Sequence, residues 1–200
     1  RTFYKGEYHY LDNGNLRKLN LPEDSRIADL FENQLLVRLK SKWSVSDKTL
    51  PQGALISLPI DKLIAGKPEP LSVHIPGEHS TITSVDATAD AVIVNTMTNV
   101  ASKLLRYTFN NGKWISQPAV DSLANGVLYV SNTSPEHGDF TVSFQNLLSP
   151  DTLYHVPVGN AVPRKLKQAP ARFDASQLKV GQHWAKSKDG TKIPYFLVHS

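Results

Sequence analysis

Histidine and carboxylate side chains are the residues of this chain with the chemistry to bind a metal ion, because imidazole nitrogens and carboxylate oxygens are common metal ligands. The closest histidines are His74 and His79, with Glu78 between them. A separation of five residues fits one face of neither a helix nor a strand, so we interpret them as loop residues. Asp86 and Asp90 flank a loop without a calcium-binding pattern. Four other histidines are isolated in the sequence: His9, His137, His155 and His183. The sequence therefore predicts no metal site and no cofactor.

Covalent catalysis needs an activated nucleophile, and the sequence offers none in a recognisable setting. Cysteine is absent, which excludes a thiol nucleophile, thiolate metal ligands and a disulfide framework. No serine lies in a G-x-S-x-G motif, the strained turn that exposes the nucleophile of α/β-hydrolases. We therefore predict that the chain has no catalytic residue of its own.

Charge and hydropathy exclude further classes of partner. The net charge is +4, but the basic residues are scattered, and the densest cluster, residues 164–167, is typical of a solvated edge strand. We therefore expect no nucleic-acid partner. No apolar run approaches the roughly 20 residues of a membrane helix, so we expect no membrane partner. A chain without cysteine fits the cytoplasm and the periplasm equally, and the Asn132 sequon matters only in a eukaryotic secretory setting.

Short runs in which apolar and polar residues alternate dominate the chain and predict β-strands. Phe140, Val142 and Phe144, for example, alternate with polar residues, whereas residues 91–94 are apolar throughout, as in a strand covered on both faces. Three pairs predict tight hairpins in which both residues tolerate positive φ: Asn13-Gly14, Asn111-Gly112 and Asp189-Gly190. One short helix is predicted, with Asp61 as its N-cap and Gly66 as its stop.

The predicted strands fall into three groups of four, preceded by a hairpin over residues 3–11 and 16–21. The groups comprise residues 27–31, 35–42, 54–58 and 71–75; then 81–85, 91–96, 103–109 and 114–117; then 127–132, 140–145, 153–158 and 164–167. A four-strand unit that recurs at roughly 40–50 residues is the spacing of propeller blades. We predict an all-β fold: a partial β-propeller of about three four-stranded antiparallel blades with a leading hairpin, ending in a β-hairpin. Periodicity alone also allows a β-sandwich.

Three stretches carry more information than the alternation. Residues 34–43 (QLLVRLKSKW), followed by 50–55 (LPQGAL), resemble a stretch in the propeller of bacterial members of the prolyl oligopeptidase family. Residues 173–176 (FDAS) resemble the segment that leaves the last blade. Residues 187–196 (SKDGTKIPYF) are similar to the hairpin that begins the family's peptidase domain. The three stretches occur in the family's order and span most of the chain.

The resemblance implies a propeller that covers an α/β-hydrolase domain whose catalytic Ser, Asp and His lie downstream of this hairpin. Residues 1–172 are then a partial β-propeller, and residues 173–200 are the crossover segment and first hairpin of a truncated α/β-hydrolase domain. His199 lies too early to be the catalytic histidine. The implied parent is a serine oligopeptidase that hydrolyses short peptides after proline, with the propeller gating access of the peptide substrate. The chain alone is expected to be an inactive, non-catalytic propeller fragment.

Without the resemblance, the residues are also compatible with two other functions. One is a stand-alone β-propeller or sandwich module that binds protein partners. The other is a sugar-handling propeller, because residues 187–191 are faintly similar to an Asp-box, although that box does not recur. In the family, propeller loops that face the hydrolase domain can touch substrate. Residues 44–51 and 134–139 form long polar loops, which we interpret as plain surface connections on a side that the sequence leaves open.

The two ends of the chain suggest a piece of a longer protein. The sequence starts at Arg1 and ends on the apolar stretch 196–200, which we interpret as an artificial cut, since natural termini are usually polar. An incomplete ring has open blade faces, and a final hairpin over residues 179–200 has unpaired edges. We therefore expect the fragment to self-associate through open blade faces, unless long loops cover them. The apolar residues assigned to these faces are Phe3, Tyr8, Val180 and Trp184.

Overall fold

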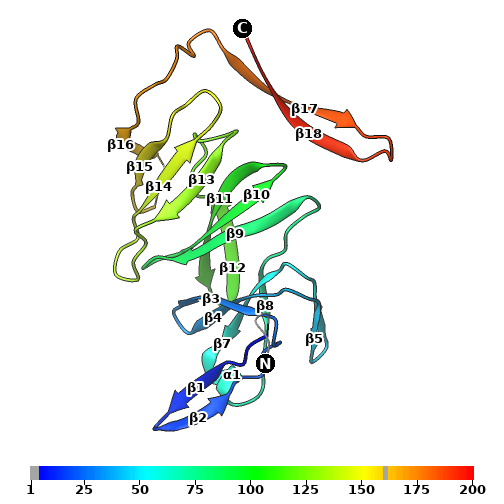
Figure 1. Ribbon diagram of the computed structural model, residues 1–200. Coiled ribbons are helices and arrows are strands. Elements are labelled where there is room, and N and C mark those ends of the chain that lie inside the picture. The colour runs from blue at the N-terminus through cyan, green and yellow to red at the C-terminus, as the bar shows by residue number, and fades with distance from the viewer. Residues whose placement is uncertain (1–4, 160–161) are drawn as a thin grey trace.

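Three four-stranded antiparallel sheets stack one on the next along the chain, and two-stranded hairpins flank the stack (Figure 1). The structure is a computed structural model that describes residues 5–159 and 162–200. Strands make up 54% of the chain and helix 3%, so the prediction of an all-β fold is confirmed. The stacked four-stranded sheets match a partial β-propeller, and we call them blades 1, 2 and 3 in chain order.

Each blade is a meander of antiparallel strands, and the three predicted groups correspond to the three blades. Blade 1 contains β3 (Arg26–Phe31), β4 (Gln34–Arg38), β7 (Leu55–Pro59) and β8 (Leu71–His74). Blade 2 contains β9 (Ser80–Ala87), β10 (Val92–Thr98), β11 (Ala101–Asn110) and β12 (Lys113–Pro118). Blade 3 contains β13 (Val127–Ser131), β14 (Phe140–Gln145), β15 (Thr152–Val156) and β16 (Arg164–Gln168).

In the part of the chain that the structure describes, three hairpins lie outside the blades. The hairpin of β1 (His9–Asp12) and β2 (Asn15–Lys18) precedes blade 1, and that of β17 (Lys179–Lys186) and β18 (Lys192–His199) follows blade 3. The third, β5 (Trp43–Val45) with β6 (Lys48–Leu50), lies in the connection between β4 and β7, where we expected a polar loop. The alternation there is too short to predict strands, and Ser46, at φ 53°, takes the turn position that Asn or Gly usually marks.

Two of the three predicted tight turns have both residues in the left-handed region. Asn13 and Gly14 have φ of 47° and 84°, and Asn111 and Gly112 have φ of 48° and 75°. The expectation of positive φ at both residues was wrong for Asp189-Gly190, where only Gly190 has it, at 88°. The Asp189 carboxylate accepts hydrogen bonds from the Thr191 N–H and the Ser187 hydroxyl, and these bonds favour a wider turn.

The predicted helix forms as α1 (Ile60–Ile64) between β7 and β8, but its N-cap is Pro59. The assignment of Asp61 as N-cap was therefore wrong. Asp61 lies in the first turn, where its negative charge favours the helix N-terminus, and it accepts a hydrogen bond from Asn33 Nδ2 at 3.1 Å. Gly66 ends the helix as expected, with φ of 73°.

Apolar side chains fill the seams between the blades, because each strand turns alternate residues to opposite faces of its sheet. Leu36, Leu55 and Phe31 of blade 1 pack against Val92 and Tyr107 of blade 2. The next seam joins blades 2 and 3 through a second core of buried residues: Ile93, Leu104, Ala119, Val120, Leu128, Phe140, Val142, Phe144 and Val156. Two seams of this kind explain why residues 91–94 are apolar on both faces.

Polar groups also cross the seams. A carboxylate oxygen of Asp29 on β3 accepts a hydrogen bond from the Ala87 N–H on β9 at 2.7 Å. The buried Asn95 donates from Nδ2 to the Leu128 carbonyl of blade 3, also at 2.7 Å. Because an unpaired buried backbone group is costly, these side chains fix the register of one blade on the next.

The two outer faces of the stack differ from each other. The face of blade 1 that points away from blade 2 is covered by the N-terminal segment, β5–β6 and α1, with Tyr8 packed against this third core. The outward face of blade 3 carries polar residues, including Ser131, Thr141 and Ser143. Of the apolar residues assigned to open faces, Phe3 lies outside the described residues, while Val180 and Trp184 lie on the C-terminal hairpin.

Candidate functional site

The C-terminal hairpin β17–β18 lies at one end of the blade strands, and this end is the candidate functional site. Gln182 on β17 donates a hydrogen bond from Nε2 to the carbonyl of Asn99, in the turn between β10 and β11, at 2.8 Å. Because neighbouring strands are antiparallel, the connections that follow the second and fourth strands of a blade leave at the same end. We call this end the hairpin face; it comprises the turn 99–100 and the connections 119–126 and 146–151.

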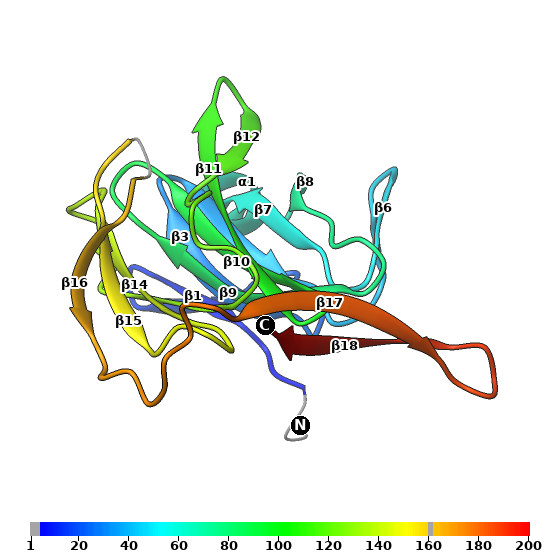
Figure 2. The ribbon, with the colours of Figure 1, turned by 90° about the horizontal axis from the view of Figure 1, so that it is seen from above.

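The two long loops predicted from the sequence lie at opposite ends of the strands. The β5–β6 hairpin extends on the same side as β17–β18, as both views show (Figures 1 and 2). Residues 134–139 instead approach the β9–β10 connection, where the Ala89 N–H donates to the His137 carbonyl at 3.0 Å. Of these two loops, residues 44–51 therefore share the side of the C-terminal hairpin.

The β10–β11 turn has an unusual residue for its conformation. Thr98 pairs with Ala101, so Asn99 and Val100 form a two-residue turn, with φ of 49° and 71°. Such turns usually carry Gly at the second position, and a β-branched residue with positive φ is a genuine outlier. Val100 is 53% exposed, so burial within blade 2 does not account for the conformation. The sequence predicted strands at 91–96 and 103–109 but not this tight turn, because Asn-Val is a weak turn signal.

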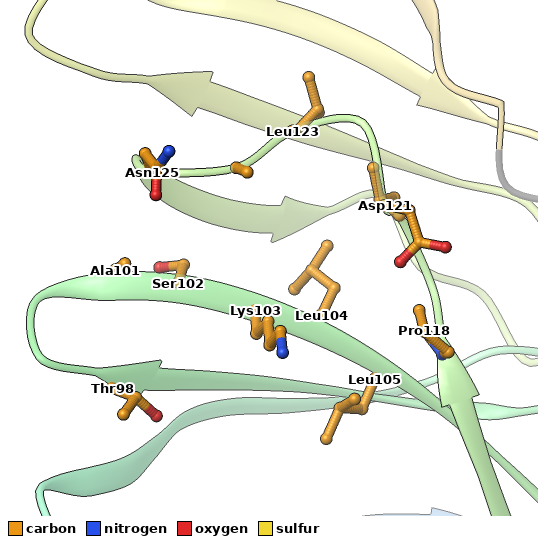
Figure 3. Close-up of a pocket in the computed structure, with 12 residues that line it drawn as sticks. Thr98, Ala101, Ser102, Lys103, Leu104, Leu105, Pro118, Asp121, Leu123 and Asn125 are labelled. Carbon is orange, nitrogen blue, oxygen red and sulfur yellow. The ribbon is translucent and has the colours of Figure 1, made fainter. Parts of the chain in front are cut away.

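Two cavities flank this turn. One, of about 350 Å³, lies between β11 and the β12–β13 connection and is lined by Thr98, Leu104 and Leu123 (Figure 3). The second, of about 420 Å³, is lined by residues of the hairpin face and by the C-terminal hairpin: Val100, Asn125, Gly126, Val127, Gln145, Asn146, Leu147 and Phe196. Asn125 lines both cavities. The second cavity therefore lies between blades 2 and 3 and Phe196 of the hairpin.

The chain passes close to a blade 3 side chain at Gly126. A Cβ atom at this position would overlap the Phe144 ring and the carbonyl of Gln145. The Gly126 carbonyl accepts a hydrogen bond from the Ser102 N–H at 2.9 Å, which ties the β12–β13 connection to β11. Glycine at this position thus lets blades 2 and 3 meet at the hairpin face.

The hairpin β17–β18 itself exposes apolar and aromatic side chains. The rings of His183 and Tyr195 stack with centroids 5.6 Å apart. Ile193, Tyr195 and Leu197 lie on one face of β18 and are 49%, 45% and 46% exposed. A two-stranded hairpin is at best marginally stable in water. The hairpin therefore leaves an apolar face exposed on this chain.

The opposite end of the strands carries an ion pair at the seam between blades 2 and 3. Arg106 donates to both carboxylate oxygens of Asp90, at 2.7 Å and 3.4 Å. The Thr88 hydroxyl also donates to Asp90, at 3.1 Å, and a Cβ atom on Gly138 would lie 2.7 Å from the Asp90 carboxylate. Both carboxylate oxygens of Asp90 thus accept hydrogen bonds from neighbouring side chains, so we interpret Asp90 as a structural residue.

The predicted histidines are dispersed over the structure. The spacing to His79 placed His74 in a loop, but it ends strand β8, within the predicted strand 71–75. A ring nitrogen of His74 lies 2.8 Å from the Tyr107 hydroxyl of blade 2. Burial lowers the pKa of His74. His79 lies in an exposed turn, 3.5 Å from Glu78. Three further histidines lie on separate elements: His9 on β1, His137 in the β13–β14 loop and His183 on β17.

His155 lies on β15, 2.8 Å from a carboxylate oxygen of Asp139. The hydrogen bond from His155 lowers the pKa of Asp139. Within residues 5–159 and 162–200, no group of three or more histidine and acidic side chains is placed to hold a metal ion.

Two predictions about surface elements can be compared with the structure. Residues 164–167 lie on β16, the last strand of blade 3, and each is exposed, as expected of a solvated edge strand. Asn132 has φ of 53° and donates from Nδ2 to the Thr141 hydroxyl at 2.8 Å. The part of the chain that the structure describes contains no helix long and apolar enough to cross a membrane.

Comparison with known proteins identifies the family. The model of the prolyl oligopeptidase N-terminal β-propeller domain matches residues 4–169. An uncharacterized peptidase of Sinorhizobium fredii, y4nA, is 31% identical over 203 residues, which cover 98% of this chain and 28% of that protein. An uncharacterized peptidase of Rickettsia prowazekii is 27% identical, over 100% of this chain and 28% of that protein.

Solved structures agree with the family model. A post-proline cleaving enzyme from Rickettsia typhi has a TM-score of 0.81 and 27% identity, covering 98% of this chain and 29% of the enzyme. Apo prolyl oligopeptidase B from Galerina marginata has a TM-score of 0.73 over 99% of this chain and 28% of its own; at 16% identity, this likeness shows the fold alone. The chain thus spans less than a third of each of these four proteins. It belongs to the prolyl oligopeptidase family, and its blades are part of that family's N-terminal β-propeller.

Proposed function

We propose that this chain is a non-catalytic segment of a serine peptidase of the prolyl oligopeptidase family. Residues 1–172 supply part of the propeller, and residues 173–200 supply the crossover segment and the first hairpin of the peptidase domain. The observation that carries the proposal is the family match over residues 4–169, after which the chain leaves blade 3 and forms a separate hairpin.

The role proposed for the blades is to cover the active site and restrict its access to short peptides. The position of β17–β18 on the hairpin face supports this role, because a domain that begins with this hairpin starts beside the blade ends. The β5–β6 hairpin extends on the same side (Figure 2). Of the loops considered from the sequence, it is the better candidate to meet a peptide substrate. The peptides proposed for the whole protein are cleaved after proline, as the name of the Rickettsia typhi enzyme states for that protein.

The test compares this chain with a form extended through the coding sequence that follows it. The extended form should release a fluorophore from a short proline-linked peptide, and a serine-directed inhibitor should block the release. The 200-residue chain alone should release none. Activity of the isolated chain that scales with its concentration and is blocked by the inhibitor would refute the non-catalytic assignment.

A second comparison tests gating. Deletion of the propeller from the extended form should allow cleavage of folded or long substrates that the intact form rejects. If the following coding sequence instead ends at a stop codon, or encodes no G-x-S-x-G motif, the chain is not part of a serine peptidase. The alternative of a stand-alone binding module is then favoured.

A further inference from the structure

We propose that the β10–β11 turn is a detachable docking point for the C-terminal hairpin, with Val100 as its apolar anchor and β17–β18 as its partner. The proposal deepens the proposed function, and it rests on that function for the identity of the hairpin as the start of the peptidase domain. The docking contact itself is argued from the positions of Asn99, Val100, Gln182 and Phe196.

The backbone conformation at Val100 is the first observation. Its φ of 71° places a β-branched side chain in the left-handed region, where glycine is the favoured residue. Strained positions of this kind persist where the surroundings determine them, and they cluster at functional sites. The equivalent position of the β11–β12 turn is occupied by Gly112, at φ of 75°, so these two-residue turns of blade 2 differ at this position.

The second observation is that the same turn contacts the hairpin through its other residue. Asn99 accepts the hydrogen bond from Gln182, and Asn99 in turn donates its N–H to the His79 carbonyl at 3.3 Å. Between the described residues, the bond from Gln182 is the only hydrogen bond that joins the hairpin to the blades. The contact between hairpin and blades is therefore concentrated at this turn.

The third observation is the shape of the contact. Val100 and Leu147 from the blades and Phe196 from the hairpin line the same cavity of about 420 Å³. This pocket is open to solvent, so the hairpin and the blades are not closely packed against each other here. An apolar contact that is held by one hydrogen bond and leaves a cavity is suited to opening and closing. The geometry thus points to a contact that can open, so that the hairpin leaves the blades while the blades stay folded.

The test is hydrogen exchange of the 200-residue chain, read separately over residues 179–199 and over blade 2. In Val100→Gly, the glycine adopts the turn without strain, so blade 2 should keep or gain protection. Exchange over residues 179–199 should become about 5- to 30-fold faster, the factor expected when a contact of one or two kcal/mol is lost. Gln182→Ala, on the exposed hairpin side, should accelerate the same amides and leave blade 2 unchanged.

Gly112→Val is the matched control, because it places valine at the same position of a similar turn where nothing lies within 4 Å of the added Cβ. It should lower the protection of blade 2 without a selective effect on residues 179–199. Unchanged hairpin exchange in both Val100→Gly and Gln182→Ala would overturn the proposal. Hydrogen exchange is independent of peptidase activity. An inactive extended protein would therefore count against the proposed function and not against the docking contact between the β10–β11 turn and the hairpin.

Discussion

The indole nitrogen of Trp114 donates a hydrogen bond to the hydroxyl of Ser57 at 2.8 Å, from the last strand of blade 2 to the third strand of blade 1. Ser57 is fully buried. The Trp114 ring also packs against Phe109, at a centroid distance of 4.9 Å, and against Phe31, at 5.9 Å. The pair thus combines a specific polar contact with aromatic packing across one seam.

The first prediction concerns this bond. Trp114→Phe keeps an aromatic ring in the seam but leaves the buried Ser57 hydroxyl without its donor, which should cost about 1–3 kcal/mol of unfolding free energy. Urea titration followed by circular dichroism measures the loss. Trp184→Phe, at a residue that is 45% exposed, is the control and should change stability by less than about 0.5 kcal/mol. An equal effect of the two substitutions would contradict the role of the bond.

Gly126 is predicted to tolerate no larger residue. Gly126→Ala places a methyl group against the Phe144 ring and the Gln145 carbonyl, and the overlap should cost about 1–3 kcal/mol. Gly77→Ala is the matched control, because nothing lies within 4 Å of the added methyl group and the native φ is not positive. Both variants are compared by thermal unfolding. Similar melting temperatures for Gly126→Ala and the unmodified chain would show that blades 2 and 3 do not meet as described.

Asp86 should make stability depend on pH. Burial raises its pKa, the neighbouring Asp29 carboxylate adds to the rise, and the Ser84 hydroxyl opposes it. The unfolded chain titrates this group at the ordinary pKa of about 3.9, so between that value and the folded pKa the folded state holds more protons. Stability therefore falls as pH rises through this window, and the penalty persists above it. Asp86→Asn should be more stable than the unmodified chain at pH 7, and the difference should vanish below about pH 4.

Asp90→Asn is the matched comparison: it should lower stability at pH 7, whereas Asp86→Asn should raise it. The ion pair of Asp90 with Arg106, whose side chain is only 11% exposed, is lost in Asp90→Asn. Removing one partner of a charged hydrogen bond should lower stability at pH 7 by about 1–3 kcal/mol. The urea midpoints of Asp86→Asn, Asp90→Asn and the unmodified chain, measured at pH 7 and at pH 3.5, test these two predictions. Destabilisation by Asp86→Asn at pH 7 would contradict the assigned pKa direction.

Self-association of the 200-residue chain is a further prediction. The outer face of blade 1 is covered, and that of blade 3 is mostly polar, with Tyr129 58% exposed among its polar residues. The exposed apolar face of β18 is therefore the surface we expect two copies to share. Light scattering at micromolar concentration should give a mass above the 22.2 kDa of one chain. Replacing Ile193 and Leu197 with threonine should restore a monomer. A single 22.2 kDa species of the unmodified chain that binds no hydrophobic dye is the contrary result.

Much of the architecture was predictable because its signals are local. Alternation over five or six residues predicted the twelve strands of the blades, and Asn13-Gly14 and Asn111-Gly112 predicted two turns. The β5–β6 hairpin escaped prediction because its three-residue strands carry too little alternation. Asp61 was misplaced as an N-cap because sequence places a cap only to within a residue or two.

The sequence by itself determined the family, the all-β class and the order of the strands, because each depends on residues that are neighbours in the chain. Only the tertiary structure decided which residues meet across the seams and which loops share the hairpin face. Asp29 and Ala87 are 58 residues apart, and Gln182 and Asn99 are 83 apart. Such contacts depend on how whole sheets stack, and no local periodicity encodes them. The strained Val100 became a candidate anchor only when the fold placed it beside the C-terminal hairpin.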